Sequence, residues 1–332
     1  MKLEYIEEIR SNIWDKTISQ FDTKFLFHQS AWLKFLEETQ PGKVLRFRIV
    51  DGGMTMGYFV GLLLEKRNIK ILGSPLPGWT TDYMGPIVNK GFDYKSFIYS
   101  LVNTCRNFGI QHIELNNPFL DKGIMQEMHF HYHEGITYLT PLFKDENLMW
   151  DNLKSNCRNR IRKAQKNELI VEDCIDPIFI NEYYDQLNEV FKHKNLVPTY
   201  SIQRVESLFK NLKPDLLFTL RVKHNDKIIA TGIFPHDDRC IYFFGGASWK
   251  EYQSLCPNEI LHWTAMTRAA KLGIETYNMC GGGSFKPKFG GLKVQEYNYW
   301  RSFTIRARFG RQAYRYIFYT KQKLKGIIKN FL

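Results

Sequence analysis

The sequence lacks the features that mark several large classes of protein. Its six cysteines are scattered with no Cys-x-x-Cys pair, so zinc-finger spacing is missing and a disulfide framework is not expected in a chain of this length. No apolar run approaches the roughly eighteen residues that a transmembrane helix needs. The N-terminus, MKLEYIEEIRSNIW, carries acids where a signal peptide has an apolar segment. These absences predict a cytoplasmic protein with reduced thiols.

Common catalytic and nucleotide-binding signatures are also missing. A P-loop needs Gly-Lys followed by Ser or Thr, between a strand and a helix, and the glycine-rich stretch GGGSFKPKFGGLKV (281–294) has neither feature. A Rossmann loop opens the first βαβ unit of its domain, whereas this stretch comes late and leads into a predicted strand. No Gly-x-Ser-x-Gly elbow or Cys/His signature marks a covalent nucleophile.

Positive charge is what the sequence has in excess. The 332 residues carry a formal charge of +12, with a pI of about 9.3. Such an excess is typical either of a generic basic surface or of a protein with an anionic partner: nucleic acid, a phosphorylated substrate or a membrane surface. With 44% hydrophobic and 24% charged residues, the chain is expected to fold, and its length allows two compact domains.

Both halves of the chain show the same order of elements: a hairpin-rich sheet, a long helix and a short strand. Helices are predicted over 29–38, 92–108, 146–167, 177–194, 201–211 and 258–271, and strands over 44–50, 56–65, 68–74, 216–222, 227–235 and 240–248. The pattern predicts an α+β fold of two domains, 1–145 and 146–332, the second ending in a basic helix.

The glycine-rich stretch combines backbone freedom with charge. Glycines allow a ligand to approach the backbone closely, Lys286 and Lys288 supply two cations, and Phe285 and Phe289 are expected to anchor the stretch in a core. If the stretch is extended, its two lysines point in opposite directions. The alternative is a flexible surface turn with solvated lysines.

Two further segments are basic without acids. In KSNCRNRIRKAQKN (154–167), Arg158 and Arg162 are four residues apart and share one helix face, where arginine forks suit phosphate oxygens; the alternative is a solvated basic face. From Arg306 to the end there are eight Lys or Arg residues with interleaved aromatics. This tail suits an anionic bilayer, or its apolar residues pack on the C-terminal domain.

No metal site is predicted. His129, His131 and His133 alternate and would share one face of a strand. Three histidines can bind zinc, but no supporting carboxylates accompany them.

Three segments together resemble the Fem family. RNRIRKAQKNELIVE is similar to the segment that opens its second domain, CPNEILHWTAMTRAAKLGIETYNMCGGGSFKPKFGG resembles its closing motif, and FHQSAWLKFLEE resembles an N-terminal stretch. Members of this family transfer amino acids from aminoacyl-tRNA to peptidoglycan precursors, and they are built from two GNAT-like domains, as are related acyltransferases of surface-polysaccharide pathways. The resemblance therefore implies two tandem GNAT-like domains with mixed sheets flanked by helices, and a cleft between them within reach of Lys286.

The resemblance also implies site residues. The lysine of the family's Phe-Lys pair corresponds to Lys286, which is implied to be catalytic. The family has an aspartate shortly after a Gly-Pro; here IVNK follows Gly85-Pro86, and Asp82 is the nearest substitute. Lys34 falls near a family lysine that binds precursor phosphates. The remaining candidates for substrate binding are Trp32, Arg158, Arg162, Tyr242, Phe285 and Lys288.

The segment before the 258–271 helix bears on the identity of the acyl donor. The acetyl-CoA loop of single-domain GNAT enzymes is missing before the 258–271 helix, where YQSLCPNE stands. This favours aminoacyl-tRNA as co-substrate, with acyl-CoA and an amino sugar acceptor as the alternative, and a non-catalytic binding protein on the same scaffold as the third. No bound cofactor and no protein partner are predicted. The expected acceptor is an anionic nucleotide- or lipid-linked saccharide, at the inner face of the membrane.

Overall fold

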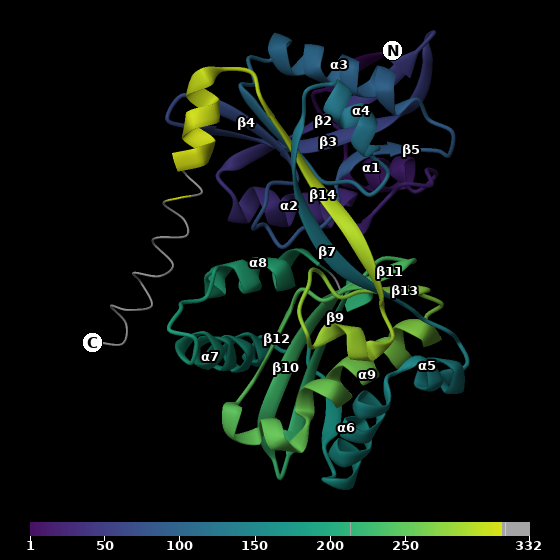
Figure 1. The fold of residues 1–332 in the computed structure, drawn as a ribbon, viewed down its shortest axis with the longest axis vertical. Coiled ribbons are helices and arrows are strands. Elements are labelled where there is room, and N and C mark those ends of the chain that lie inside the picture. The colour runs from purple at the N-terminus through teal and green to yellow at the C-terminus, as the bar shows by residue number, and fades with distance from the viewer. Residues whose placement is uncertain (213, 314–315, 317–332) are drawn as a thin grey trace. The chain divides into compact units, whose positions relative to one another are not determined.

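The computed structural model describes residues 1–212, 214–313 and 316. These residues divide into two compact units, of which unit 1 comprises Met1–Gly135 and Gln295–Tyr316 and unit 2 comprises the described part of Ile136–Val294. Strands β7 (His131–Pro141) and β14 (Leu292–Ser302) each contribute residues to both units (Figure 1). The domain limits given above, 1–145 and 146–332, stay a prediction.

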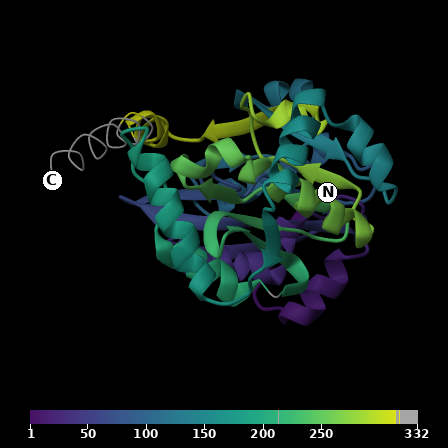
Figure 2. The same cartoon turned by 90° about the horizontal axis from the view of Figure 1, so that it is seen from below.

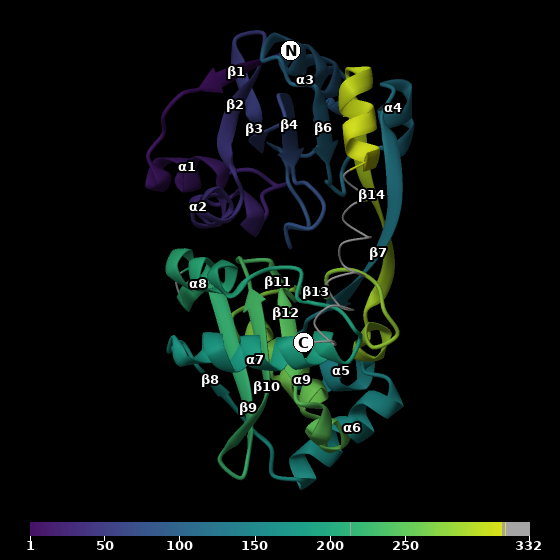
Figure 3. The same ribbon diagram turned by 90° about the vertical axis from the view of Figure 1, so that its left-hand side faces the viewer.

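Unit 1 is a mixed sheet with helices against it. Its strands follow the order β1-β2-β3-β4-β6-β14, with β4 and β6 parallel and the other pairs antiparallel (Figure 3). The elements are β1 (Lys2–Ile6), α1 (Ser11–Ile18), η1 (Leu26–His28), α2 (Ser30–Thr39), β2 (Gly42–Asp51), β3 (Met54–Lys66), β4 (Ile69–Ser74), β5 (Gly85–Val88), α3 (Tyr94–Asn107), β6 (His112–Leu115) and α4 (Lys122–Glu127).

The hairpin of β2 and β3 forms where the sequence predicts it. Gly52 and Gly53 take φ of +54° and +84°, values that glycine adopts without the steric cost of a side chain. Phe47 of β2 and Phe59 of β3 are fully buried, and Phe59 lies 5.7 Å from the ring of Phe97 on α3. The core of unit 1 therefore lies between this sheet and α3. β14 leads from the sheet into a helical segment, residues 305–313 (yellow in Figure 2).

Unit 2 contains a four-stranded antiparallel sheet in the order β12-β10-β9-β8, and a second set in which β13 pairs with β7 and β11. Its elements are α5 (Glu146–Asn152), α6 (Ser155–Lys166), β8 (Ile170–Asp173), α7 (Ile178–Lys192), α8 (Ile202–Asn211), η2 (Pro214–Leu216), β9 (Leu217–His224), β10 (Lys227–Pro235), β11 (Cys240–Tyr242), β12 (Gly245–Ser248), η3 (Lys250–Leu255), α9 (Pro257–Lys271), β13 (Thr276–Asn278) and η4 (Lys286–Phe289).

Helices α7 and α9 cover opposite faces of the four-stranded sheet. Thr231 of β10 donates a hydrogen bond to Gln186 on α7 at 2.8 Å. A Cβ atom on the next residue, Gly232, would come within 2.9 Å of Leu261 on α9. Successive side chains of a strand point to opposite faces, so β10 packs against a helix on each side and is buried along most of its length.

The predicted strand 240–248 is wrong as a single element, because it divides into β11 and β12. Phe243 N donates to Asn278 O of β13 at 3.0 Å, whereas the next amide, Phe244 N, donates to Ile233 O of β10 at 3.1 Å. Two consecutive backbone amides thus donate to strands of different sheets, so the two sheets separate between Phe243 and Phe244. Gly245 follows, where a Cβ would stand 2.3 Å from the hydroxyl of Tyr183.

Two predicted helices of unit 2 illustrate how well local patterns locate elements. The helix predicted over 258–271 is confirmed as α9, and Gly273 with φ +83° follows its last turn, as the glycine of a helix C-terminus commonly does. The single helix predicted over 146–167 is instead two, α5 and α6, separated at Leu153 and Lys154.

Candidate active site

The glycine loop, residues 279–291, leaves β13 beside the point where the two sheets of unit 2 part. Its start is held by a buried polar pair: Thr137 Oγ1 donates to Asn278 Oδ1 at 2.6 Å, and neither residue has exposed surface. The same Asn278 oxygen accepts from Cys280 N at 2.8 Å, and Gly281 N donates to Thr137 Oγ1 at 3.2 Å. These three bonds fix the direction in which the loop leaves the sheet.

Lys286 closes the loop on itself. Its Nζ donates to Cys280 O at 2.6 Å and to Gly281 O at 3.1 Å. Cys280 and Gly281 have φ of +55° and +92°, which is strained for cysteine but not for glycine. The half-buried ammonium is therefore held by backbone oxygens next to exposed Gly282. A cation that is positioned in this way needs little rearrangement to meet a developing negative charge.

Lys288 has a different environment. The segment from Lys286 to Phe289 is a short 3₁₀-helix, not the extended stretch that we expected. Lys288 Nζ lies 2.5 Å from a carboxylate oxygen of Glu259 on α9, and Arg160 of α6 donates to that same oxygen at 2.6 Å. Glu259 is only 2% exposed. Lys288 and Arg160 thus share one buried carboxylate, which ties the loop to two helices.

An aromatic cluster lies beneath the loop. Phe289 is fully buried, and the ring of His262 lies 4.9 Å from its ring and 5.4 Å from the ring of Phe285. The expected anchoring role of these phenylalanines is therefore confirmed. His262 Nδ1 lies 2.6 Å from the hydroxyl of Tyr277. Burial, assisted by the charges of Lys288 and Lys286, lowers the pKa of His262 to about 3. The imidazole is therefore neutral and acts as part of the packed floor.

Helix α6 lies beside the loop, since Lys154 N, at its start, donates to Lys288 O at 3.0 Å. Arg158 donates through Nη1 to the carbonyl oxygens of Asp151, at 3.1 Å, and of Leu153 at the end of α5. Arg162 is exposed, and its guanidinium carbon lies 5.2 Å from the centre of the Trp150 ring. Between Arg158 and Arg162, it is Arg162 whose guanidinium group is more accessible to a phosphate.

Three candidates belong to unit 1. Trp32 is fully buried, and its Nε1 donates to Thr81 Oγ1 at 3.1 Å, so it supports the fold of α2 from inside. Lys34, on the outer face of the same helix, is exposed, and Asp82 is half-buried. Tyr242, in unit 2, lies on β11 and is 2% exposed. The roles proposed for these four residues stay predictions.

The sequence analysis missed Glu259 and His262, although both stand in the quoted segment CPNEILHW. No local signal could have found them, because the burial of most residues of α9 follows from its packing in unit 2. Both lie among the buried residues of α9, and Glu259 has cationic partners there, because an unpaired buried charge is very costly.

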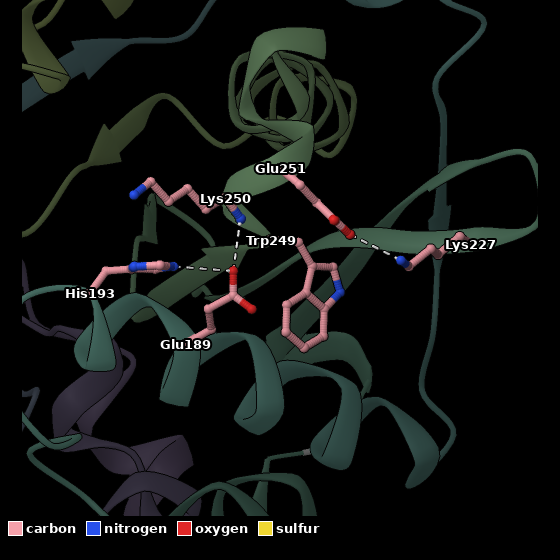
Figure 4. Close-up of a pocket in the computed structure, with 6 residues that line it drawn as sticks. All are labelled: Glu189, His193, Lys227, Trp249, Lys250 and Glu251. Atoms are coloured by element: carbon pink, nitrogen blue, oxygen red, sulfur yellow. Dashed lines mark hydrogen bonds and ion pairs between the residues drawn. The ribbon is translucent and has the colours of Figure 1, made fainter. Parts of the chain in front are cut away.

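An open hollow of about 660 Å³ lies elsewhere on unit 2 (Figure 4). Its lining residues are Glu189, His193, Lys227, Trp249, Lys250 and Glu251. Glu251 pairs with Lys227 at 3.1 Å, and Glu189 accepts from the backbone of Lys250 at 3.0 Å. These charges offset one another, and Lys286 is not among the lining residues, so we do not assign the reaction to this hollow.

Two other expectations concern the whole of the described chain. In residues 1–212, 214–313 and 316, no group of histidine, cysteine or acidic side chains could hold a metal ion. His129, His131 and His133 do not all lie on one strand as expected, because His129 precedes β7 and has φ +58°. The His131 ring stacks on the Trp300 ring with 4.4 Å between their centres. Within the described part, no helix is both long and apolar enough to span a bilayer.

Residues 151–289 match the family model of the acetyltransferase (GNAT) domain, a segment that contains α6, α9 and most of the glycine loop. No curated protein sequence matches the chain.

Several solved structures have the same fold. FemX aligns with a TM-score of 0.73 at 15% identity, covering 93% of this chain and 99% of FemX. L-PGS from Bacillus licheniformis aligns at 0.52 and 10% identity, covering 91% and 95%. A tandem GNAT protein from the clavulanic acid biosynthesis pathway aligns at 0.52 and 9% identity, covering 91% and 99%. The predicted fold class is thus confirmed: the chain has the α+β fold of tandem GNAT proteins, shares it with FemX, and carries a GNAT domain at residues 151–289.

Proposed function

We propose that this protein is an aminoacyl transferase that forms an amide or ester bond on a cell-envelope precursor, with aminoacyl-tRNA as the donor. The observation that carries the proposal is the ammonium of Lys286, held by Cys280 O and Gly281 O on the exposed loop of a GNAT domain. The Fem-like motifs and the fold shared with FemX and L-PGS support it.

The proposed reaction is attack of an acceptor amine on the ester carbonyl carbon of the donor. A C–N bond forms, the C–O bond to the tRNA ribose breaks, and the amine proton passes to the leaving hydroxyl. The tetrahedral intermediate carries a negative oxygen, which Lys286 would stabilise by a few kcal/mol, as comparable donors do. An aminoacyl ester is already reactive, so positioning of the two substrates supplies much of the remaining acceleration. Asp82 is proposed as the second catalytic residue.

The start of α9 disfavours acyl-CoA as the donor. Helix N-termini bind phosphates through free backbone N–H groups and the helix dipole. Here Pro257 removes a donor at the first position, Cys256 takes φ +67°, and the Glu259 carboxylate occupies the first turn. That carboxylate is buried with Lys288 and Arg160. A pyrophosphate at this helix would meet a negative charge and two cations that are already paired.

The basic surface of α6 is the proposed contact for the acceptor's phosphates. Arg162 and Lys163 are exposed on this helix, and the backbone bond from Lys154 to Lys288 brings it to the glycine loop. A nucleotide- or lipid-linked saccharide carries the phosphates that such a surface recognises.

A second candidate is acyl-CoA-dependent acylation of an amino sugar. The family model describes an acetyltransferase domain, and the tandem GNAT structure is described as lacking AcCoA, which names acetyl-CoA as that protein's ligand. The third candidate, a non-catalytic binding protein, is disfavoured by the positioned Lys286.

The test is transfer from each donor separately. Purified protein is incubated with labelled aminoacyl-tRNA pools or with labelled acyl-CoAs, with envelope extract as the acceptor. We expect label to reach the acceptor from aminoacyl-tRNA only. Transfer from acyl-CoA alone would establish the second candidate, and binding of acceptor without transfer from either donor would establish the third.

A further inference from the structure

The helical segment 305–313 of unit 1 has apolar side chains on its outer face. Ile305 is 77% exposed and Phe309, one turn later, is 66% exposed, so the two lie on the same side of the helix. Tyr316 is also 76% exposed. A surface helix normally turns its apolar stripe to the core and its polar residues to water. In this segment Ile305 and Phe309 face water instead of the core.

The inner face of the segment is anchored by charge. Arg311 Nε lies 2.7 Å from a carboxylate oxygen of Glu114 on β6, and both side chains are less than a tenth exposed. The Arg311 guanidinium also lies over the ring of Trp300, 4.1 Å from its centre. Ala307 is buried against the unit. The segment is therefore docked, and the exposure of Ile305 and Phe309 is a consequence of how it is docked.

Cations surround the exposed pair. Arg306 and Arg308 are exposed on the segment itself, and Lys66 and Arg67 are exposed at the turn between β3 and β4. Arg306 donates to Arg67 O at 2.9 Å, which brings the turn and the segment together. In the sequence, no acid follows Glu296, while four lysines follow residue 320. The apolar pair thus stands among exposed cations, and Glu65, before Lys66, is the exposed acid at the adjoining turn.

We propose that this basic-apolar patch, formed by Ile305, Phe309, Arg306, Arg308, Lys66 and Arg67, docks on an anionic lipid bilayer. Ile305 and Phe309 enter the boundary between headgroups and acyl chains, and the arginines contact lipid phosphates, as in interfacial amphipathic helices. Ile305 favours a bilayer over nucleic acid, because bases stack on aromatic rings and guanidinium groups, whereas an aliphatic side chain gains from burial in hydrocarbon. The patch lies outside the GNAT domain, and its test does not depend on the transfer reaction.

The test is flotation of the full-length protein with vesicles of phosphatidylglycerol and phosphatidylcholine, against vesicles of phosphatidylcholine alone. We expect binding to the anionic vesicles that weakens as salt is added. The double variant Ile305→Ser/Phe309→Ser should lose about tenfold or more in partitioning. Arg308→Gln should lose about fivefold. Both variants alter exposed side chains, and unchanged melting temperatures would exclude unfolding as the cause.

Met54 provides a matched control. It is 68% exposed and begins β3, whose last residue, Lys66, belongs to the patch. By the rise of an extended strand, Met54 lies about 40 Å from Lys66. Met54→Ser should bind vesicles like the wild type. Full binding by the Ile305/Phe309 double variant would overturn the proposal. Equal loss of vesicle binding in all three variants would also overturn it. So would binding to tRNA in place of vesicles, if that binding depended on Arg308 and not on Phe309.

Discussion

Glu259 and Lys288 form a buried ion pair, 2.5 Å between carboxylate oxygen and Nζ, that joins helix α9 to the glycine loop. Arg160 reaches the same oxygen from α6 with its side chain about half exposed. Three segments that are distant in the sequence are therefore held together by one carboxylate. Its neutralisation would leave two cations without their counter-charge.

We therefore predict that Glu259→Gln destabilises unit 2. Removal of one partner from a buried pair typically costs about 3–5 kcal/mol, and the partial exposure of Arg160 places the expected loss near the lower value. Urea unfolding measures it. The matched control is Glu251→Gln, which breaks a pair with Lys227 whose side chains are both more than half exposed and should cost less than about 1 kcal/mol. Equal losses in the two variants would show that the Glu259 pair contributes no more than a surface pair.

Lys286 should affect rate more than stability. Lys286→Met keeps much of the apolar stem and removes the charge, and loss of such a donor typically lowers kcat by about 10²–10³. KM should change little if the contact forms mainly in the transition state. The measurement is single-turnover transfer with the active donor, together with thermal melts.

The control for Lys286 must be a lysine outside the site. Lys288 is unsuitable, because its partner is the buried Glu259. Lys293 is exposed at the start of β14, and Lys293→Met makes the same chemical change a few residues later. Wild-type turnover in Lys286→Met would place the catalytic centre elsewhere, and comparable losses in both variants would indicate a general effect of charge.

His262 should make stability fall in mild acid. Burial lowers its pKa to about 3, whereas in the unfolded chain it titrates near its ordinary value of about 6.5. Between these two values the unfolded state binds a proton that the native state does not, so stability rises with pH across this window by up to about 1.4 kcal/mol per unit. His28 in unit 1, whose pKa is also lowered to about 3 by burial, adds to the same trend.

Two measurements check this pH dependence. Urea unfolding between pH 5 and pH 7.5 should show stability rising with pH, and His262→Gln should have a smaller slope than the wild type. Nitrogen-15 NMR of the imidazole should show a neutral His262 ring at pH 5. A protonated ring in the folded protein at that pH would contradict the assignment.

Substitutions of Arg158 and Arg162 should have different effects, the first mainly on stability and the second mainly on binding of the acceptor. Arg158 caps the end of α5 through two backbone carbonyls, so Arg158→Ala should cost about 1 kcal/mol of stability. Arg162→Ala should cost less but raise KM for a phosphate-bearing acceptor and flatten the dependence of KM on salt. Thermal melts and KM at several salt concentrations distinguish the two. If the salt dependence is unchanged in both variants, this face of α6 is a solvated basic surface.

Local sequence pattern was sufficient for much of the fold. The α9 helix, with proline at its first position and glycine after its end, and the β2–β3 hairpin, with its two glycines, follow from periodicity and turn chemistry within a few residues. The glycine-rich stretch and the Phe285-Lys286 pair were likewise visible as a candidate site, because unusual composition needs no tertiary contact to be noticed.

Tertiary contacts decided the rest. Nothing local tells whether an acid in the first turn of a helix is solvated or buried, and Glu259 is buried because Lys288 and Arg160, 29 and 99 residues away, come to it. The run 240–248 has no charged residue, begins with apolar and aromatic residues, and predicts one strand. It becomes two because Phe243 N pairs with β13 and Phe244 N with β10. The sequence by itself determined where most of the long helices and strands lie, through local sterics and periodicity. The partner of each backbone amide and each buried charge was decided only when distant segments packed together.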